Sequence, residues 1–438
     1  MLEKNSKPQT LSSKSQTQEG KIHRMVYLVS VLTFFSILAP ALLHSNDKEL
    51  FTALFASPTN PLSELTIVHY SSLYDSVYYV AFIVGLIIGP LSDTKGKRKV
   101  FIIIGSLGFI LFSTLLRYSP NFQILLLFRL FQGISHILVW QTLMVLVYDY
   151  SGSNIAKSVS IYTIFMGMAM GTGTMTAGFF ANLGTFVPIC ISIGSYIIVF
   201  LLAILFLKDP KLLTHRPTMK QSIFLVKEKP HILVPAFFNF IDRFHMGFLI
   251  AIIPLYLTFV ISLKPSMRGM IFGLSAIPSI VLSYPVGKKS DGPWGRIKPL
   301  ALGSLIYGTL LSLTGFVAQD SLVIFIVFLM LQGCAQGLTM TPNNSLMGDI
   351  IEPEHNAMAV SIFNFFGNVG MILGPIFGLI FGSNYSLAFL VAGIIEIVSL
   401  FVNIFLARKL KVMEKIGFEF PTIAKKVYRA LKSLVHKE

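Results

Sequence analysis

The stretch Gly89-Pro-Leu-Ser-Asp93-Thr-Lys-Gly96-Lys97-Arg98-Lys99 decides the fold of this chain. A related stretch, Gly287-Lys-Lys-Ser-Asp291-Gly-Pro-Trp-Gly295-Arg296, follows about 200 residues later. Each copy follows an apolar segment of helix length and precedes another. Glycine permits a sharp reversal of the chain, and the cations favour the hydrated membrane surface. The two stretches therefore predict a tight basic turn between two membrane spans, present once in each half of a duplicated membrane protein.

The composition agrees with a membrane protein. Of the 438 residues, 54% are apolar and only 13% are charged, and the mean hydropathy is +0.72, which a soluble chain of this length could not bury. Windows of about 20 apolar residues predict twelve spans. They begin near positions 25, 71, 100, 121, 157, 186, 232, 268, 299, 321, 357 and 386. The expected fold class is an all-α integral membrane protein with twelve transmembrane helices in two six-helix, pseudo-symmetric halves.

Lysine and arginine are distributed unevenly over the predicted loops. The chain has 35 of them, and roughly 29 fall in the two tails and in the loops that follow even-numbered spans. Because short basic loops remain in the cytoplasm, both tails are expected to be cytoplasmic, in a multi-pass protein of the cell membrane. The net charge of +15 is explained by this topology, so the lipid bilayer is an expected partner and nucleic acid is not.

The chain divides into five expected segments. Residues 1–24, rich in Ser, Gln, Lys and Thr, form a disordered cytoplasmic tail. Residues 25–207 and 232–407 form the N-terminal and C-terminal six-helix bundles, joined by a cytoplasmic linker at 208–231. Residues 408–438 form a basic amphipathic tail suited to the membrane surface, with a partner-binding helix as the alternative. A cleavable signal peptide is the alternative for the first span, but its removal would break the symmetry of the halves.

Internal repetition supports the duplication position by position. The offset is 198 from Asp93 to Asp291, 200 from Gln132-Gly133 to Gln332-Gly333, 200 from Asp149 to Asp349, and 201 from Val159-Ser160-Ile161 to Val360-Ser361-Ile362. Within each half the spacing from the glycine to the aspartate is the same, 16 residues. Four matches in the same order indicate a real repeat with small loop insertions.

These motifs resemble those of the major facilitator superfamily. The first turn matches the family's Gly-x-Leu-x-Asp-x-x-Gly-basic-basic signature, the second turn matches with one extra residue, and Arg129, Gln132 and Gly133 match Arg-x-x-Gln-Gly in the fourth span. The resemblance covers residues 25 to 407 and implies a transporter with a gate in each turn. The gate residues would be Gly89, Asp93, Gly96, Lys97, Arg98, Gly287, Asp291, Gly295 and Arg296.

The resemblance also implies how the gates work. Asp93 would contact the start of the eleventh span, and Asp291 the start of the fifth, when the cytoplasmic side is closed. The alternative is a loop that sets topology and never changes its contacts. Because the second copy carries an insertion with a Pro-Trp pair, we expect two unequal gates.

The family lines its central cavity with spans 1, 4, 7 and 10. On spans 4, 7 and 10 of this chain, polar residues recur at three- and four-residue spacing, which places them on or beside one helix face. The candidate residues for a substrate and proton cavity are Arg129, Gln132, His136, Asn239, Asp242, Arg243, Gln332, Gln336 and Asn343.

Charges inside the spans need a reason, because each costs about 2.5 to 3.5 kcal/mol on insertion. Asp242 is expected to carry a proton or to contact the solute, while Arg129 tunes Asp242 or binds an anionic group. The alternative is a static ion pair between Asp242 and either Arg129 or Arg243. His245 points away from the polar stripe and is expected to pack, and Glu396 near the middle of the twelfth span has no assigned role.

Glycine patterns depart from those of the family's drug-proton antiporters, the branch that the chain loosely resembles. Those proteins carry Gly-Pro with flanking glycines in the fifth span. Here the fifth span lacks the proline, and the Gly374-Pro375 pair lies in the eleventh. Small residues at such spacing let helices approach closely, which is the simpler interpretation.

The expected function is secondary active transport of a small organic solute by alternating access. Proton coupling is the leading energy source because no nucleotide-binding loop is present, and efflux is slightly favoured over uptake. Uptake or exchange of an anionic or zwitterionic metabolite is one alternative, and a non-transporting membrane sensor is another. No catalytic residue, cofactor or metal site is expected, since Cys190 and Cys334 lie inside predicted spans. The protein is expected to be a monomer, and it is not expected to be an enzyme.

Overall fold

The computed structural model describes residues 24–43, 46–95, 97–151, 155–209, 219–292, 294–317, 321–351 and 356–415. Within these ranges nearly all residues are helical, and the β pairing is limited to one isolated bridge between Ser57 and Asn60. The expected all-α fold class is therefore confirmed. The expected tails lie outside the described residues except for Arg24 and residues 408–415, and residues 210–218 of the linker also lie outside them.

Each half contributes six membrane-crossing segments. In the N-terminal half these are α1 (Arg24–Ala41), α3 (Glu64–Lys95), α4 (Arg98–Leu116), α5 (Phe122–Ser151), α6 (Ile155–Leu183) and α7 (Val187–Phe206). In the C-terminal half they are α9 (Leu233–Phe259), the pair α10 (Pro265–Leu274) and α11 (Ala276–Ser290), α12 (Ile297–Val317), α13 (Leu322–Ile350), α14 (Asn356–Phe381) and α15 (Tyr385–Lys409). Eleven of these segments are long and apolar enough to cross a membrane by the residues described, and α3, at 32 residues, is the twelfth long helix.

Short helices lie between and after the spans. They are α2 (Asp47–Phe55), α8 (Met219–Glu228), the 3-10 turn η2 (Pro230–Ile232) and α16 (Val412–Lys415). The apolar windows miss them because each is too short or too polar to resemble a span.

Polar caps set several helix starts. The Ser63 hydroxyl accepts a hydrogen bond from the backbone N–H of Thr66 at 3.2 Å, so α3 begins seven residues before the expected apolar window. Asn384 caps α15 in the same way through the N–H of Leu387 at 3.1 Å. Hydrophobic windows locate spans, whereas capping side chains decide where the helices begin.

The eighth span is broken at Ser275, where α10 ends and α11 begins. Pro278, the third residue of α11, has no N–H to donate to the carbonyl of Leu274, and its ring crowds that carbonyl. The break therefore follows from the proline.

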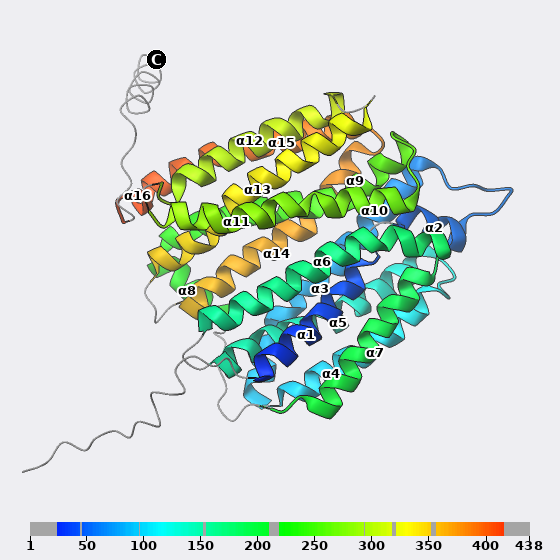
Figure 1. The fold of residues 1–438 in the computed structure, drawn as a ribbon, viewed down its shortest axis with the longest axis horizontal. Helices are drawn as coiled ribbons and strands as arrows, with labels where there is room; N and C mark the ends of the chain where they lie inside the picture. The colour runs from blue at the N-terminus through cyan, green and yellow to red at the C-terminus, as the bar shows by residue number, and fades with distance from the viewer. Residues whose placement is uncertain are drawn as a thin grey trace, which may run out of the picture.

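The two halves repeat the same helix packing. In the N-terminal half the pairs α4–α5, α1–α6, α3–α5 and α4–α7 are in contact, and their counterparts α12–α13, α9–α14, α11–α13 and α12–α15 are in contact in the C-terminal half. Between the halves, α3 packs on α14 and α6 on α10. The sequence repeat therefore corresponds to two six-helix bundles with matching internal contacts (Figure 1).

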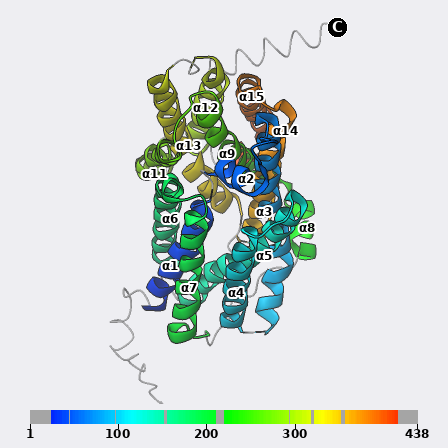
Figure 2. The same cartoon turned by 90° about the vertical axis from the view of Figure 1, so that its right-hand side faces the viewer.

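The bundle has two distinct ends. We call the end where α1 begins and α15 ends the terminus end, and the opposite end, which carries α2, the α2 end (Figure 1). Figure 2 looks at the molecule from the α2 end.

Buried apolar side chains form clusters at three levels between the α2 end and the terminus end, and these clusters differ in whether they include one half or both. At the α2 end one cluster draws on both halves, with Phe51 and Tyr74 beside Phe248 and Tyr256. In the middle a smaller cluster again draws on both, with Tyr78 and Ile137 beside Ile250 and Met371. At the terminus end there are two clusters, each built from one half. The halves are thus joined at the α2 end and in the middle, and pack separately at the terminus end.

Candidate functional site

The first basic turn forms a buried ion pair at the terminus end. Nε of Arg98, at the start of α4, lies 2.6 Å from Oδ2 of Asp149 near the end of α5, and both side chains are 0% exposed. The structure does not describe the Asp93 side chain, the surroundings of Gly89, or Gly96, and Lys97 is exposed. The expected contact of Asp93 with the eleventh span therefore stays a prediction.

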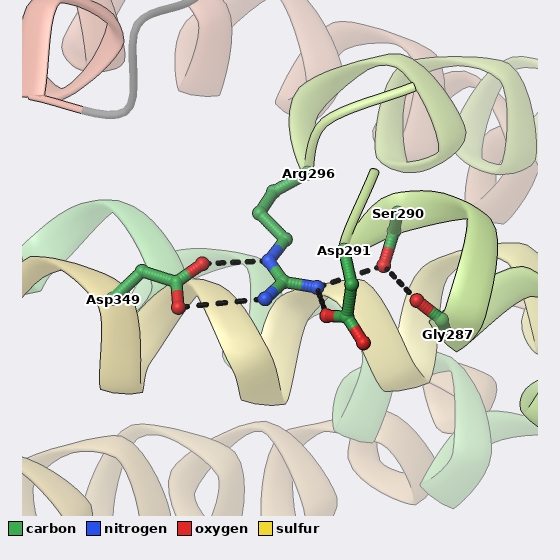
Figure 3. Close-up of polar contacts among 5 residues, drawn as sticks. All are labelled: Gly287, Ser290, Asp291, Arg296 and Asp349. Atoms are coloured by element: carbon green, nitrogen blue, oxygen red, sulfur yellow. Dashed lines mark hydrogen bonds and ion pairs between the residues drawn. The ribbon is translucent and has the colours of Figure 1, made fainter. Parts of the chain in front are cut away.

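The second turn forms a related pair one repeat later. Nε of Arg296 donates to Oδ2 of Asp349 at 2.6 Å, and Nη1 donates to Asp291 and, at 2.9 Å, to the Ser290 hydroxyl (Figure 3). Ser290 in turn donates to the Gly287 carbonyl at 2.9 Å. Partial burial alone would lower the pKa of Arg296, but the hydrogen bonds and charges of Asp349 and Asp291 raise it above its ordinary value.

The two turns are equivalent in position and unequal in environment. The side chains of Arg296 and Asp349 are 13% and 40% exposed, in contrast to the fully buried first pair. Asp291 is 66% exposed and its ion pair is with Arg296, in its own turn. The repeated aspartates are visible in the sequence, but their arginine partners are not, because a spacing along one helix does not identify the neighbour on another.

The candidate residues on α5 are engaged inside the N-terminal half. Arg129 donates to Gln132 Oε1 at 2.6 Å, and Gln132 donates to the Ser113 hydroxyl on α4 at 2.7 Å. His136 Nδ1 lies 2.7 Å from the hydroxyl of Tyr196 on α7. All three candidates are buried, and these hydrogen bonds join α5 to α4 and α7.

Arg129 pairs with a carboxylate on α3. Its guanidinium lies over the rings of Tyr74 and Tyr78, at 4.0 and 4.3 Å from their centroids, and Nη2 is 3.8 Å from Asp75 Oδ1. Asp75 is buried. Among the described residues the ion pair of Arg129 is therefore with Asp75, and the structure does not join Arg129 to Asp242.

Asp47, on α2 outside the spans, extends this buried group. The Ser71 hydroxyl donates to its carboxylate. Burial raises the pKa of Asp47 well above its ordinary value, and the nearby charge of Asp75 raises it further, while the hydrogen bond from Ser71 and the charge of Arg129 act in the opposite direction.

The candidates on α9 and α13 hold the C-terminal half together or face its interior. Asn239 donates to the Phe363 carbonyl at 2.7 Å, and the side-chain oxygen of Asn343 accepts from the Asn239 backbone N–H at 3.2 Å. Gln332 donates to the Thr314 hydroxyl at 2.8 Å, which repeats the Gln132 contact one half later.

Three candidates keep part of their surface uncovered. Asp242, Arg243 and Gln336 are half-buried, and among the described residues neither Asp242 nor Arg243 has an ion-pair partner within 4.0 Å. Nη1 of Arg243 lies 3.6 Å from the Met246 sulfur, and Met246 packs against the middle cluster between the halves. Among the candidate cavity residues, these three are therefore the ones whose side chains the described residues do not fully cover.

His245 and Glu396 form a buried pair that sequence spacing does not identify. His245 on α9 lies 3.2 Å from Glu396 on α15, Nδ1 to Oε2. The helical angle does indicate that His245 leaves the polar stripe, but no pattern on one helix identifies a carboxylate 151 residues away.

At the α2 end an ion pair connects the halves. Nη2 of Arg268 on α10 donates to Glu49 on α2, and Nη1 donates to the Thr258 hydroxyl on α9 at 2.5 Å. The Lys48 ammonium lies 5.0 Å from the centre of the Phe259 ring. We call the Glu49–Arg268 pair the α2 latch.

Similarity to known proteins agrees with this architecture. A family model described as Major Facilitator Superfamily matches residues 26–239 and 235–436. A Bacillus subtilis (strain 168) protein named as an uncharacterized MFS-type transporter, YqjV, is 32% identical over 147 residues, which cover 33% of this chain and 35% of that protein. The chain thus aligns with about a third of that relative.

Two solved structures share the fold. A bacterial homolog to the human lysosomal transporter Spinster, in an inward-facing and unoccupied conformation, has a TM-score of 0.70 and 13% identity, covering 89% of this chain and 96% of that one. A D-xylose-proton symporter has a TM-score of 0.71 and 11% identity, covering 86% and 97%. At these identities the similarity extends to the fold alone.

Proposed function

Because this chain belongs to the major facilitator superfamily of secondary membrane transporters, we propose that it moves a small organic solute by alternating access, driven by protons. Efflux in exchange for protons is the favoured direction, although the Gly374-Pro375 pair lies in α14 rather than in α6. We further propose that the protein acts as a monomer in the cell membrane with both termini in the cytoplasm, because the basic loops lie at the terminus end.

The observation that carries this proposal is the layered contact between the halves. They share apolar clusters at the α2 end and in the middle, and have separate clusters at the terminus end. Such an arrangement suits one of two alternating states, in which a solute enters from the terminus end and stops at the middle cluster. There it would meet Asp242, Arg243 and Gln336.

Arg243 favours a second candidate function, the uptake or exchange of an anionic or zwitterionic metabolite. Its guanidinium is half-buried beside Met246 and has no carboxylate within 4.0 Å among the described residues. A solute carboxylate would form charge-assisted, bidentate hydrogen bonds with this guanidinium, which are stronger than hydrogen bonds to a neutral acceptor. Asp242, on the same helix, would bind the ammonium of a zwitterion.

Reconstituted liposomes test both functions. Purified protein is first screened for thermal stabilisation by ethidium, nucleosides, sugars, amino acids and dicarboxylates, and the hits are added to liposomes that contain the pH dye pyranine. We expect one class of solute to change the lumenal pH only when protein is present, and Asp242→Asn to weaken that change. Ethidium would support efflux, and a carboxylate would support the second candidate. Stabilisation without counterflow of any hit would favour a sensor.

A further inference from the structure

His245 and Glu396 lie in an enclosed site between α9 and α15. Their side chains are 2% and 4% exposed, and both residues are in the middle parts of their spans. A charged group at such a position is costly unless it is compensated. The pair therefore needs a chemical reason.

The hydrogen-bond acceptors around His245 determine its protonation. Nε2 lies 2.9 Å from the Ala392 carbonyl oxygen, and Nδ1 lies 3.0 Å from the Ile241 carbonyl oxygen. Because carbonyl oxygens only accept hydrogen bonds, both ring nitrogens must carry hydrogen for these contacts to form. The ring is then an imidazolium, and the Glu396 carboxylate, 3.2 Å away, is its counter-ion.

Loss of one proton would disrupt this site. A neutral imidazole has a single N–H, so one nitrogen would face a carbonyl lone pair, and Glu396 would become a buried anion without a counter-ion. The geometry in this state of the molecule therefore favours the proton-bound pair, whose net charge is zero.

The charged neighbours supply a route for the proton. Asp242 lies one helical turn before His245 on α9, interacts electrostatically with His245, Glu396 and Arg243, and is half-buried. From α12, Tyr307 is the titratable group that faces the pair, with its ring centre 5.5 Å from that of His245. From α14, residues 359–381 contribute no titratable side chain. Asp242 is thus the group that connects the pair with the space between the halves.

We propose that His245 and Glu396 form the proton-binding site of this transporter, loaded through Asp242, and that proton binding favours the state closed at the α2 end. This proposal rests on the proposed function and specifies its coupling site. The proton is taken from water on one side of the membrane, held between the imidazole and the carboxylate, and released to the other side when the halves change places.

Spin-label distances across the terminus end test the proposal in full-length purified protein. Labels are attached to Lys208→Cys, after α7, and Lys409→Cys, at the end of α15, with Cys190 and Cys334 replaced by serine. Both lysines are exposed and belong to different halves. The labelled protein with unchanged His245 and Glu396 should lose its proton from this pair as the pH rises. The terminus end should then close, and the distance between the two labels should shorten.

Glu396→Gln is the decisive variant. Glutamine leaves no carboxylate to become a buried anion, and its amide N–H can donate to the unprotonated Nδ1 of His245. The site then has zero net charge over the pH range in which the wild-type pair loses its proton, as the proton-bound pair does. We expect loss of the pH-dependent shift and long distances throughout. Glu396→Asp keeps a carboxylate and should restore the shift, and Glu228→Gln, at an exposed carboxylate on α8, should titrate like the wild type.

The outcomes separate this proposal from the proposed function. A wild-type titration that persists in Glu396→Gln would overturn the site, even if a proton gradient drives transport. A wild type that shows no shift with pH would overturn it as well. If the shift is lost in Glu396→Gln but no solute moves with protons, the site stands as a pH-sensing pair and proton-coupled transport fails.

Discussion

At the scale of single residues, the two arginine–aspartate pairs at the terminus end predict unequal effects on stability. Asp149→Asn would leave Arg98 buried with a missing countercharge, which costs about 3 to 5 kcal/mol. Asp349→Asn would remove a partner that is 40% exposed, so about 0 to 1 kcal/mol is expected. Thermal unfolding of both variants in one detergent measures the difference, and equal losses would contradict it.

Asp47 predicts a pH dependence. Its pKa in the folded protein is raised above the ordinary value of 3.8, so folding binds a proton to this carboxyl. Its contribution to stability is therefore fully present below pH 3.8 and is lost as the pH rises through the higher folded value. Asp47→Asn imitates the protonated form, and unfolding temperatures measured from about pH 4 to about pH 8 should fall less steeply with pH than in the wild type. Parallel curves would show that Asp47 is ionised without cost.

At the scale of helices, α6 contains a matched pair of glycines. A methyl group at Gly178 would collide with the carbonyl of Pro265 on α10, in the other half, whereas a methyl group at Gly171 would meet nothing within 4 Å. Overpacking by about 1 to 3 kcal/mol would shift the equilibrium between states roughly 5- to 150-fold. Gly178→Ala is therefore expected to open the α2 end, and Gly171→Ala is the control.

Cysteine accessibility measures this opening. A cysteine at Lys48, beside Phe259 of the other half, should react faster with a membrane-impermeant maleimide in Gly178→Ala than in Gly171→Ala. Equal rates in the two variants would mean that the Gly178–Pro265 contact does not hold the α2 end closed.

The glycines of α14 have a packing role within one half. A side chain at Gly370 would strike the backbone of Phe240, and one at Gly374 the backbone of Phe244, both on α9. The Gly-Pro segment of the eleventh span therefore allows close contact between α14 and α9. Its resemblance to an antiporter motif is not evidence for drug efflux.

At the scale of the whole molecule, the two gates are expected to be unequal. The first turn matches the family signature and supplies Arg98 to a fully buried ion pair, whereas the second turn carries an insertion and its pair is partly exposed. Asp93→Asn should therefore slow transport of the identified solute more than Asp291→Asn does. Initial transport rates, measured in liposomes that contain equal amounts of each variant, test this prediction. Equal slowing by the two substitutions would contradict the expectation of unequal gates.

The sequence predicted the architecture better than the site. Hydropathy and the repeat give twelve spans in two halves because the bilayer demands long apolar helices. The same patterns miss α2, which is nine residues long and mixed in polarity. They also place Arg129 on a polar helix face without indicating that Asp75 and two tyrosines surround it. Contacts between helices depend on how each helix is rotated about its axis and on what packs against it. The periodicity of residues along one helix does not give this information.

The α2 latch affects the population of the state in which the α2 end is open. Glu49 is 25% exposed and Arg268 only 3%, so loss of the pair costs between the roughly 1 kcal/mol of an exposed pair and the about 3 to 5 kcal/mol of a buried one. Reversing a ratio of 99 to 1 takes about 5.5 kcal/mol. Loss of the Glu49–Arg268 pair would therefore raise the population of the state with an open α2 end, but the state with a closed α2 end would still predominate. The Glu49–Arg268 pair therefore sets how often the α2 end opens, and does not decide which of the two states is favoured at rest.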